Sequence, residues 1–449
     1  MLNVASSNAV KDSKFSRSFV KPLYDSYCFA NIPQTVTFLL TGEGQSALPL
    51  DVFGDLPTRY DKVVLFFVDA FGWRFFSKYA ERYALLKAFL NHGVVSQMTS
   101  QFPSTTAAHV TSIHTGLSVA QSGVYEWNYY EPLVDDVISP LLFSYAGERT
   151  PGGDLAKDSL KWSGVPAEAF FPRQSFYQRL KSKGVPSSIH QFYAYTPSTY
   201  SDIVFQGASV FPYQRFRDTL EVLTDMLLSG KDSPAYNSGS MGRAESRVSN
   251  PRHYIFLYYD KIDAVGHVYG PESQQFEEAV DLFFNMMQQC FFEKLYGKLG
   301  NTLFIMTADH GQVDVNPKTT FYLNIHAPGV ERYLQTNQKG KFLVPAGSAR
   351  DMFLHVKEEV IDEAIVFLQE HLAGLAEVYR TKDLMEQLIF GKDEPSQEFL
   401  GRVGNVVILP YENETVWWYE KGKFEMHFFG HHGGLTPQEM EIPLLVLPL

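Results

Sequence analysis

The sequence predicts an α/β fold with a largely parallel central sheet. Three short, nearly continuous apolar runs support this prediction, at residues 62–68, 254–259 and 302–307. Runs of this kind are typical of strands buried on both faces, as in a parallel sheet covered by helices. Helical stretches intervene and give the strand–helix alternation of this fold class. These stretches are residues 174–184, 214–229 and 274–298.

A carboxylate follows closely after each of the three apolar runs. Asp69 follows the first run, Asp260 and Asp263 follow the second, and Asp309 follows the third. In open α/β sheets, ligands gather outside the carboxyl ends of the strands. We therefore expect these acids to converge at one edge of the sheet.

The length of 449 residues predicts one large domain with an insertion, or two domains. We assign residues 1–325 to the first part of the core, with a flexible surface loop rich in Ser, Gly and Asn at 230–252. Residues 326–429 are interpreted as an inserted, smaller α+β cap, and the core resumes at 430–449.

Within this cap, two patterns predict local structure. Residues 357–390 have a helical and charged pattern. Residues 403–429 contain two strand-like segments, VGNVVILP and TVWWYEKGKFEMHFF, which we interpret as a hairpin.

Composition and charge exclude several classes of protein. The formal charge of −12 argues against a protein that coats nucleic acid, because phosphate backbones need basic surfaces. An acidic chain that handles phosphates can obtain positive charge from bound metal ions. Cys28 and Cys290 are too few for a disulfide framework or a cysteine-built zinc site. We find no signal peptide and no membrane span, and expect a cytoplasmic protein.

The first candidate for chemistry lies in the segment from Phe102 to Gly116. Residues 106–115 are predicted to form a short helix that Gly116 ends. Thr105 and Thr106 then lie at the helix N-terminus, where free N–H groups and the helix dipole favour an anion. The alternative is that these threonines are ordinary N-cap residues.

Two further motifs follow the second and third apolar runs. Asp263 and His267 are four residues apart on a predicted helical turn, which is a common spacing for metal ligands. Asp309 and His310 are adjacent, and Gly311 permits the sharp turn that both need to reach one ion. A surface pair and an incidental polar turn are the respective alternatives.

The last motif, Gly430-His431-His432-Gly433-Gly434, places imidazoles in a glycine-rich turn, where they are either ligands or solvent-facing. Together, the motifs supply what a site for two divalent ions needs. Nitrogen and oxygen ligands without cysteine fit zinc, with manganese or iron as alternatives.

The motif order resembles that of the type I phosphodiesterase/nucleotide pyrophosphatase branch of the alkaline phosphatase superfamily. The matching motifs are VDAFGWR, PSTTAAH with a following TG, DAVGHVYGP, TADHG and HGG, and they span roughly 60–325 and 430–449. The resemblance implies an alkaline-phosphatase-like three-layer α/β/α core that is catalytic. It also implies hydrolysis of phosphodiester or nucleotide pyrophosphate bonds in a small-molecule phosphate ester or nucleotide.

The resemblance also implies roles for individual residues. Thr106 would be the nucleophile and would form a phosphothreonine intermediate. One metal would be held by Asp69, Thr106, Asp309 and His310. The second would be held by Asp263, His267 and His432.

The chain departs from the family pattern around the predicted substrate site. Thr105 stands where the family commonly has Lys, and the phosphate-binding Asn of the family falls at Trp127, with Asn128 one position on. We predict that Asn128 binds a phosphoryl oxygen after a one-residue shift, and that Phe71 and Trp127 stack on a nucleobase. The alternative for the aromatic residues is a place in the core.

Two other functions compete with a diesterase. A phosphomonoesterase or phosphonate hydrolase could use the same site, but no Arg lies beside Thr106 to bind the extra charge of a monoester. A metal-binding regulatory module with vestigial catalysis is the second competitor. The presence of all six Asp and His ligands together with Thr106 argues against that module.

Overall fold

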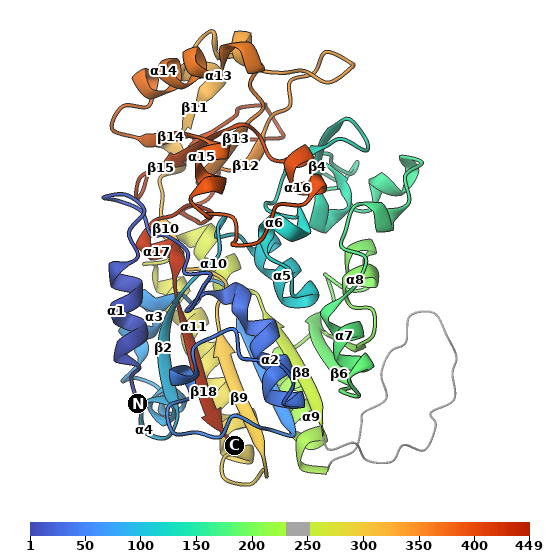
Figure 1. Cartoon of the computed structure of the whole chain (residues 1–449), viewed down its shortest axis with the longest axis vertical. Helices are drawn as coiled ribbons and strands as arrows, with labels where there is room; N and C mark the ends of the chain where they lie inside the picture. The colour runs from blue at the N-terminus through green and yellow to red at the C-terminus, as the bar shows by residue number, and fades with distance from the viewer. Residues whose placement is uncertain (230–251) are drawn as a thin grey trace.

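The computed structural model of the protein describes residues 1–229 and 252–449 (Figure 1). The loop predicted at 230–252 lies outside these residues except for Arg252. Within the described residues, a seven-stranded sheet with helices on its faces forms one part of the molecule, and a smaller four-stranded sheet lies at one end of it (Figure 1).

The central sheet has the strand order β2-β18-β9-β1-β8-β6-β7. Strand β18 is antiparallel to both of its neighbours, and the other strands run in one direction, so the predicted largely parallel sheet is confirmed. The strands are β1 (Lys62–Val68), β2 (Val94–Thr99), β6 (Ser187–Phe192), β7 (Ser209–Tyr213), β8 (His253–Tyr259), β9 (Thr302–Thr307) and β18 (Glu441–Pro448).

Strand β1 shows why an uninterrupted apolar run fits the centre of this sheet. Successive side chains of a strand point to opposite faces. The Phe66 ring packs on Phe291, at 4.9 Å between centroids, and the Phe67 ring packs on Phe29 at 5.5 Å. Both faces are therefore covered, and a polar residue on either face would lose its contact with water.

Helices form two layers, one on each face of the central sheet. One layer contains α2, α5 and α7, which contact one another in sequence, and the other contains α4, α9, α11 and α12. The helices of the main part are α1 (Val4–Asp12), α2 (Ile32–Thr41), α3 (Trp73–Tyr79), α4 (Ala84–His92), α5 (Thr106–Thr115), α6 (Val119–Ser122), α7 (Phe176–Ser182), α8 (Thr199–Val204), α9 (Phe216–Ser229), α10 (Lys261–Tyr269), α11 (Gln274–Met287), α12 (Glu293–Leu295) and α17 (Pro437–Met440). Helix α13 (Leu323–His326) lies at the end of the molecule that holds the smaller sheet (Figure 1).

Helix α5 begins at Thr106 and ends at Thr115, as the sequence predicts. Thr105 is its N-cap residue with an extended backbone, and Gly116 adopts φ 65° after the last turn. A left-handed backbone favours glycine at this position, because glycine has no Cβ to clash. The N-terminus of α5 is thereby fixed next to the carboxyl edge of the sheet.

The smaller sheet has the order β12-β13-β15-β14 and carries three helices. These elements are β12 (Ala346–Ser348), β13 (Asp351–Leu354), β14 (Ala376–Arg380), β15 (Val406–Pro410), α14 (Ile361–His371), α15 (Thr381–Glu386) and α16 (Gln397–Arg402). Short strand pairs complete the fold: β3 (Tyr129–Glu131), β4 (Asp136–Ser139) and β5 (Ser144–Tyr145) form one group, β10 (Val313–Asp314) pairs with β17 (Gly430–His431), and β11 (Phe321–Tyr322) pairs with β16 (Val416–Trp417).

The hairpin predicted within 403–429 is wrong. Strand β15 pairs with β13 on one edge and with β14 on the other, so no edge is left for β16. Strand β16 pairs with β11 instead. The prediction of helix throughout 357–390 is also wrong in part, because β14 lies between α14 and α15. Gly374, with φ 81°, separates α14 from this strand and was the available indication of a break.

The smaller sheet contributes to two hydrophobic clusters. Leu354, Ile408 and Trp417 belong to a second cluster, which is built mainly from residues between 323 and 426. Phe353 and Val407, on the opposite face, pack into the main core. The cap is thus anchored by one face of its own sheet. Its boundaries at 326 and 429 stay a prediction.

Candidate metal centre and active site

The predicted acids gather at the carboxyl edge of the central sheet. Strands β9, β1 and β8 are parallel neighbours, so the segments that follow them meet. Asp69 follows β1, Asp309 follows β9 by one residue, and Asp263 lies in the first turn of α10 after β8. All three carboxylates lie in one Asp/His cluster with His310 and His432.

His310 is the centre of one group of side chains. Its Nε2 atom lies 3.1 Å from Asp309 Oδ2 and 3.5 Å from Asp69 Oδ1. The hydroxyl Oγ1 of Thr106 lies 3.2 Å from the same nitrogen. Asp69, Asp309 and His310 are all buried, and their ligand atoms lie within 4.8 Å of one another.

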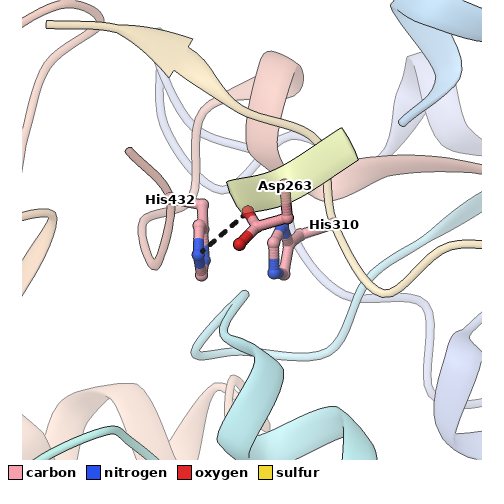
Figure 2. A group of neighbouring side chains, drawn as sticks. All are labelled: Asp263, His310 and His432. Carbon is pink, nitrogen blue, oxygen red and sulfur yellow. Dashed lines mark ion pairs between the residues drawn. The ribbon is translucent and has the colours of Figure 1, made fainter. Parts of the chain in front are cut away.

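The second group is built around Asp263 (Figure 2). Asp263 Oδ2 lies 3.3 Å from His267 Nε2, and Asp263 Oδ1 lies 3.7 Å from His432 Nε2. The His267 and His432 Nε2 atoms are 3.2 Å apart. The His310 and His432 rings stack with 3.6 Å between centroids, which connects the two groups (Figure 2).

Backbone carbonyls orient the three imidazoles. His267 Nδ1 donates to Gly430 O at 2.7 Å, His310 Nδ1 to Gly311 O at 3.0 Å, and His432 Nδ1 to Ser104 O at 3.0 Å. Because a carbonyl only accepts, the proton of each neutral ring lies on Nδ1 and Nε2 is left with a lone pair. Carbonyl-held rings with free Nε2 atoms are typical of metal ligands.

The donor atoms of the cluster fit divalent ions. Asp69 Oδ1 and Asp309 Oδ2 are buried and have no hydrogen-bond donor from the part of the chain that the structure describes. Buried ionised oxygens without a partner are costly, whereas a cation would satisfy them. The donor set of carboxylates and imidazoles suits zinc and similar metals.

Burial and the charges of the cluster shift the pKa values of its members in different directions. Burial raises the pKa of Asp69 well above its usual value, and the neighbouring Asp309 and Asp263 raise it further. Burial would also raise the pKa of Asp309, but His310 lowers it to about 2. Burial and the nearby His310 and His267 hold the pKa of His432 well below its usual value. Asp309 is therefore available as an ionised ligand and His432 as a neutral one, and a cation would offset the cost of ionising Asp69.

Several supporting residues escaped the sequence analysis. The Tyr258 hydroxyl donates to Asp69 Oδ2, and Gln312 Nε2 donates to Asp263 Oδ1. The backbone N–H of Ala70, which has φ 60°, donates to Asp309 Oδ1 at 3.1 Å. Tyr258 lies within an apolar strand, where no local pattern distinguishes a ligand-orienting tyrosine from a core tyrosine.

The structure separates the two threonines at the start of α5. Thr106 is half-buried and faces His310, whereas Thr105 is 3% exposed and its side chain lies beside Glu126. Asp260, the additional ligand candidate after β8, accepts hydrogen bonds from Tyr195 and Lys261 and belongs to neither ligand group.

The three predicted substrate-binding residues have different environments. Asn128 is 7% exposed, and its Oδ1 accepts a hydrogen bond from Ser139 at 2.7 Å. Trp127 is 38% exposed, so part of its ring is free. Phe71 is 1% exposed and packs on Phe284 at 5.3 Å. A ring buried in this way has no free face for a nucleobase, so the core alternative applies to Phe71.

Comparison with known proteins identifies the family of this chain. The model of the type I phosphodiesterase/nucleotide pyrophosphatase family matches residues 63–435, which is most of the chain. The chain belongs to the type I phosphodiesterase/nucleotide pyrophosphatase family. Its members are metal-dependent, and this chain is a phosphoric ester hydrolase of the phosphodiesterase/nucleotide pyrophosphatase type. No curated protein matches the sequence.

Solved structures share the fold at low sequence identity. Murine ectonucleotide pyrophosphatase/phosphodiesterase 5 has 16% identity and a TM-score of 0.58 over 86% of this chain and 88% of that chain. An inactive threonine-to-alanine variant of the murine protein, in complex with AMP, has 16% identity and a TM-score of 0.59 over 86% of this chain and 88% of that chain. The human ectonucleotide pyrophosphatase/phosphodiesterase 5 has 17% identity and a TM-score of 0.55 over 86% of this chain and 87% of that chain. These likenesses confirm the alkaline-phosphatase-like α/β class.

The helices of the protein were compared with the length and apolarity of a membrane span. Over residues 1–229 and 252–449, the structure contains no helix with the length and apolar character that crossing a bilayer requires.

Proposed function

We propose that this hydrolase cleaves phosphodiester and nucleotide pyrophosphate bonds at a two-metal site, with Thr106 as the nucleophile. The observation that supports this most directly is the place of Thr106 Oγ1, 3.2 Å from His310 Nε2 in the Asp/His cluster. Thr106 is also the first residue of α5, where free N–H groups and the helix dipole favour a developing oxyanion and a phosphoryl group.

Two groups of ligands would hold the metals. Asp69, Thr106, Asp309 and His310 would hold one ion, and Asp263, His267 and His432 would hold the other. Bound divalent ions lower the pKa of a hydroxyl or water and offset the charge of phosphoryl oxygens. We expect zinc, and manganese or iron are the alternatives.

The protein residues would act in two displacements. In the first, Thr106 Oγ1 loses its proton to solvent and bonds to phosphorus, while the leaving oxygen departs with the electron pair of its bond to phosphorus and takes up a proton from solvent. In the second, water attacks phosphorus, the phosphothreonine bond breaks, and the Thr106 hydroxyl is restored. The Thr106 N–H and the Asn128 side chain would donate to a non-bridging oxygen, and Trp127 would stack on a nucleobase.

An assay with a chromogenic aryl ester of thymidine monophosphate tests this proposal, with and without a chelator. We expect metal-dependent release of the aryl alcohol and, by elemental analysis, two bound zinc, manganese or iron ions per chain. Asp309→Asn replaces a charged ligand with a neutral one and should empty one site. Less than one tightly bound ion under metal-replete conditions would overturn the two-metal site. Two bound ions without turnover of any ester would favour a regulatory module.

A further inference from the structure

A further pair of buried carboxyl groups, Glu126 and Asp351, lies near the N-cap residue of α5, Thr105. Two contacts bring the 125–128 segment against the smaller sheet: Gly347 N–H donates to Asn128 O at 2.7 Å, and the Tyr125 and Phe353 rings lie 4.9 Å apart. Between these contacts, Glu126 and Asp351 lie within hydrogen-bonding reach of each other. Neither residue belongs to the Asp/His cluster.

Each carboxyl group of this pair is only half satisfied. Glu126 Oε2 accepts from Trp127 N–H, and Asp351 Oδ1 accepts from the N–H of Ser348 at 3.1 Å and from its hydroxyl. The other two oxygens, Glu126 Oε1 and Asp351 Oδ2, find no hydrogen-bond donor among the described residues. Both side chains are 0% exposed, so bulk water does not solvate these oxygens.

Arg350, the described arginine nearest to the pair along the chain, does not neutralise it, because its guanidinium group binds elsewhere. Its Nε and Nη2 atoms donate to the two oxygens of Glu439, each at 2.9 Å, and its Nη1 atom donates to Tyr411 O at 2.7 Å. Burial raises the pKa of Glu126 to about 7, and burial together with the charge of Glu126 raises the pKa of Asp351. The pair therefore requires a positive species, either a proton or a cation.

The surroundings of the pair favour a hard cation. The nearby ligand atoms are oxygens: those of the two carboxyl groups and the hydroxyl of Thr105, whose side chain lies beside Glu126. Hard divalent cations prefer such ligands. We propose that Glu126 and Asp351, with the Thr105 hydroxyl, form a binding site for Mg²⁺ or Ca²⁺ that is separate from the Asp/His cluster.

The proposed ion would lie next to the N-terminus of α5, because Thr105 is the N-cap residue of that helix. Because Asp351 begins β13, the ion also joins the cap to the segment that carries the nucleophile.

The first test measures ion binding without turnover, so its result does not depend on the proposed function. The full chain is loaded with two equivalents of zinc and titrated with CaCl2 by calorimetry. Terbium is titrated in parallel, because Trp127 lies beside Glu126 and can sensitise its luminescence. We expect one further ion per chain. Glu126→Gln and Asp351→Asn should each weaken its binding at least about tenfold, and exposed Glu278→Gln should not.

A charge replacement tests the same site without removing a carboxylate. Thr105→Lys should bind no further Ca²⁺, and its thermal midpoint in zinc alone should match that of the wild-type protein in zinc and calcium. This variant decides the matter if Glu126→Gln and Asp351→Asn do not fold. If the wild-type protein binds no further ion, the proposed site is wrong, and a proton shared by Glu126 and Asp351 neutralises the pair instead. Undiminished binding in either carboxamide variant or in Thr105→Lys also overturns it.

Discussion

Buried carboxylates serve two different purposes in this molecule. At the boundary between the cap and the core, Glu439 pairs with Arg350 and Glu131 pairs with Arg402, and all four side chains are fully buried or nearly so. In the Asp/His cluster, the equally buried Asp69 and Asp309 each have an oxygen without a donor among the described residues. Depth of burial is the same in both regions, but hydrogen-bond satisfaction differs.

The paired carboxylates, Glu439 and Glu131, are neutralised by arginines of the protein itself. Arg402 also donates to Gly123 O and Phe170 O, at 3.0 and 2.9 Å, so each of its three guanidinium nitrogens donates a hydrogen bond. Both arginines come from the predicted cap, and both glutamates come from outside it. These pairs therefore hold the cap in place, whereas the carboxylates of the cluster need a cation that the chain does not contain. The predictions below test this distinction.

The largest expected effect concerns Thr106, the hydroxyl that faces the cluster. Thr106→Ala should lower kcat by at least roughly 10³, because it removes the proposed covalent nucleophile. Thr105→Ala should lower kcat far less, since the Thr105 side chain lies beside Glu126, whereas the Thr106 hydroxyl contacts His310. Turnover of a chromogenic diester measures both. An exchange of the two effects would place the nucleophile one residue earlier, and no effect of either would exclude covalent catalysis.

The next effect concerns the paired region. Glu439→Gln leaves the buried Arg350 without a full counter-charge and should lower the free energy of unfolding by about 3–5 kcal/mol at pH 7. Denaturant unfolding measures this, and Glu131→Gln is the matched change at the second pair. An effect below 1 kcal/mol at both sites would contradict the structural role of the pairs.

The pH dependence of Glu439 has a definite sign. Burial would raise its pKa, but Arg350 and the hydrogen bonds from Thr436 and Gly434 lower it below its ordinary value of 4.5. A lowered folded-state pKa stabilises the protein above that ordinary value, and the stabilisation is lost as the pH falls through the lowered pKa. The wild-type and Glu439→Gln unfolding curves should therefore converge below about pH 4.5.

These contrasts also show what the sequence could disclose. Strands β1, β8 and β9 were predictable because both faces of each are buried, which leaves a continuous apolar run. Helix α5 was predictable to the residue because Thr105 and Gly116 mark its ends. The convergence of Asp69, Asp263 and Asp309 then followed from strand direction alone.

The remaining features depend on contacts between distant segments. Strand β15 lies between two partners that its own sequence does not specify, so a hairpin with β16 was equally consistent with the local pattern. The pairing of Arg350 with Glu439 spans 89 residues and has no periodic pattern. Asp351 and Glu126 meet only because β12 and β13 dock on the segment after α6.

A smaller effect concerns the choice of substrate. A monoester carries one more negative charge than a diester, and the buried arginines that could bind it are held by Glu439 and Glu131. We therefore expect a higher kcat/KM for the aryl diester of thymidine monophosphate than for the matching aryl monoester, measured on one metal-loaded preparation. A monoester preference of tenfold or more, about 1.4 kcal/mol in transition-state binding, would make the enzyme a phosphatase.

The smallest effect has the opposite sign to that of Glu439→Gln. Asp69 is buried beside Asp309, and its ionised form destabilises the metal-free protein, as its raised pKa indicates. The amide oxygen of an Asn at this position can still accept the hydrogen bond from Tyr258. Its NH2 group would replace Asp69 Oδ1, an acceptor that finds no donor among the described residues. Asp69→Asn should therefore raise the free energy of unfolding of the metal-free protein by on the order of 1 kcal/mol, while it removes the stabilisation that added zinc gives the wild-type protein. Thermal unfolding with and without zinc measures both changes. If Asp69→Asn destabilised the metal-free protein as Glu439→Gln does, the cluster carboxylates would be structural, and the distinction between the two regions would fail.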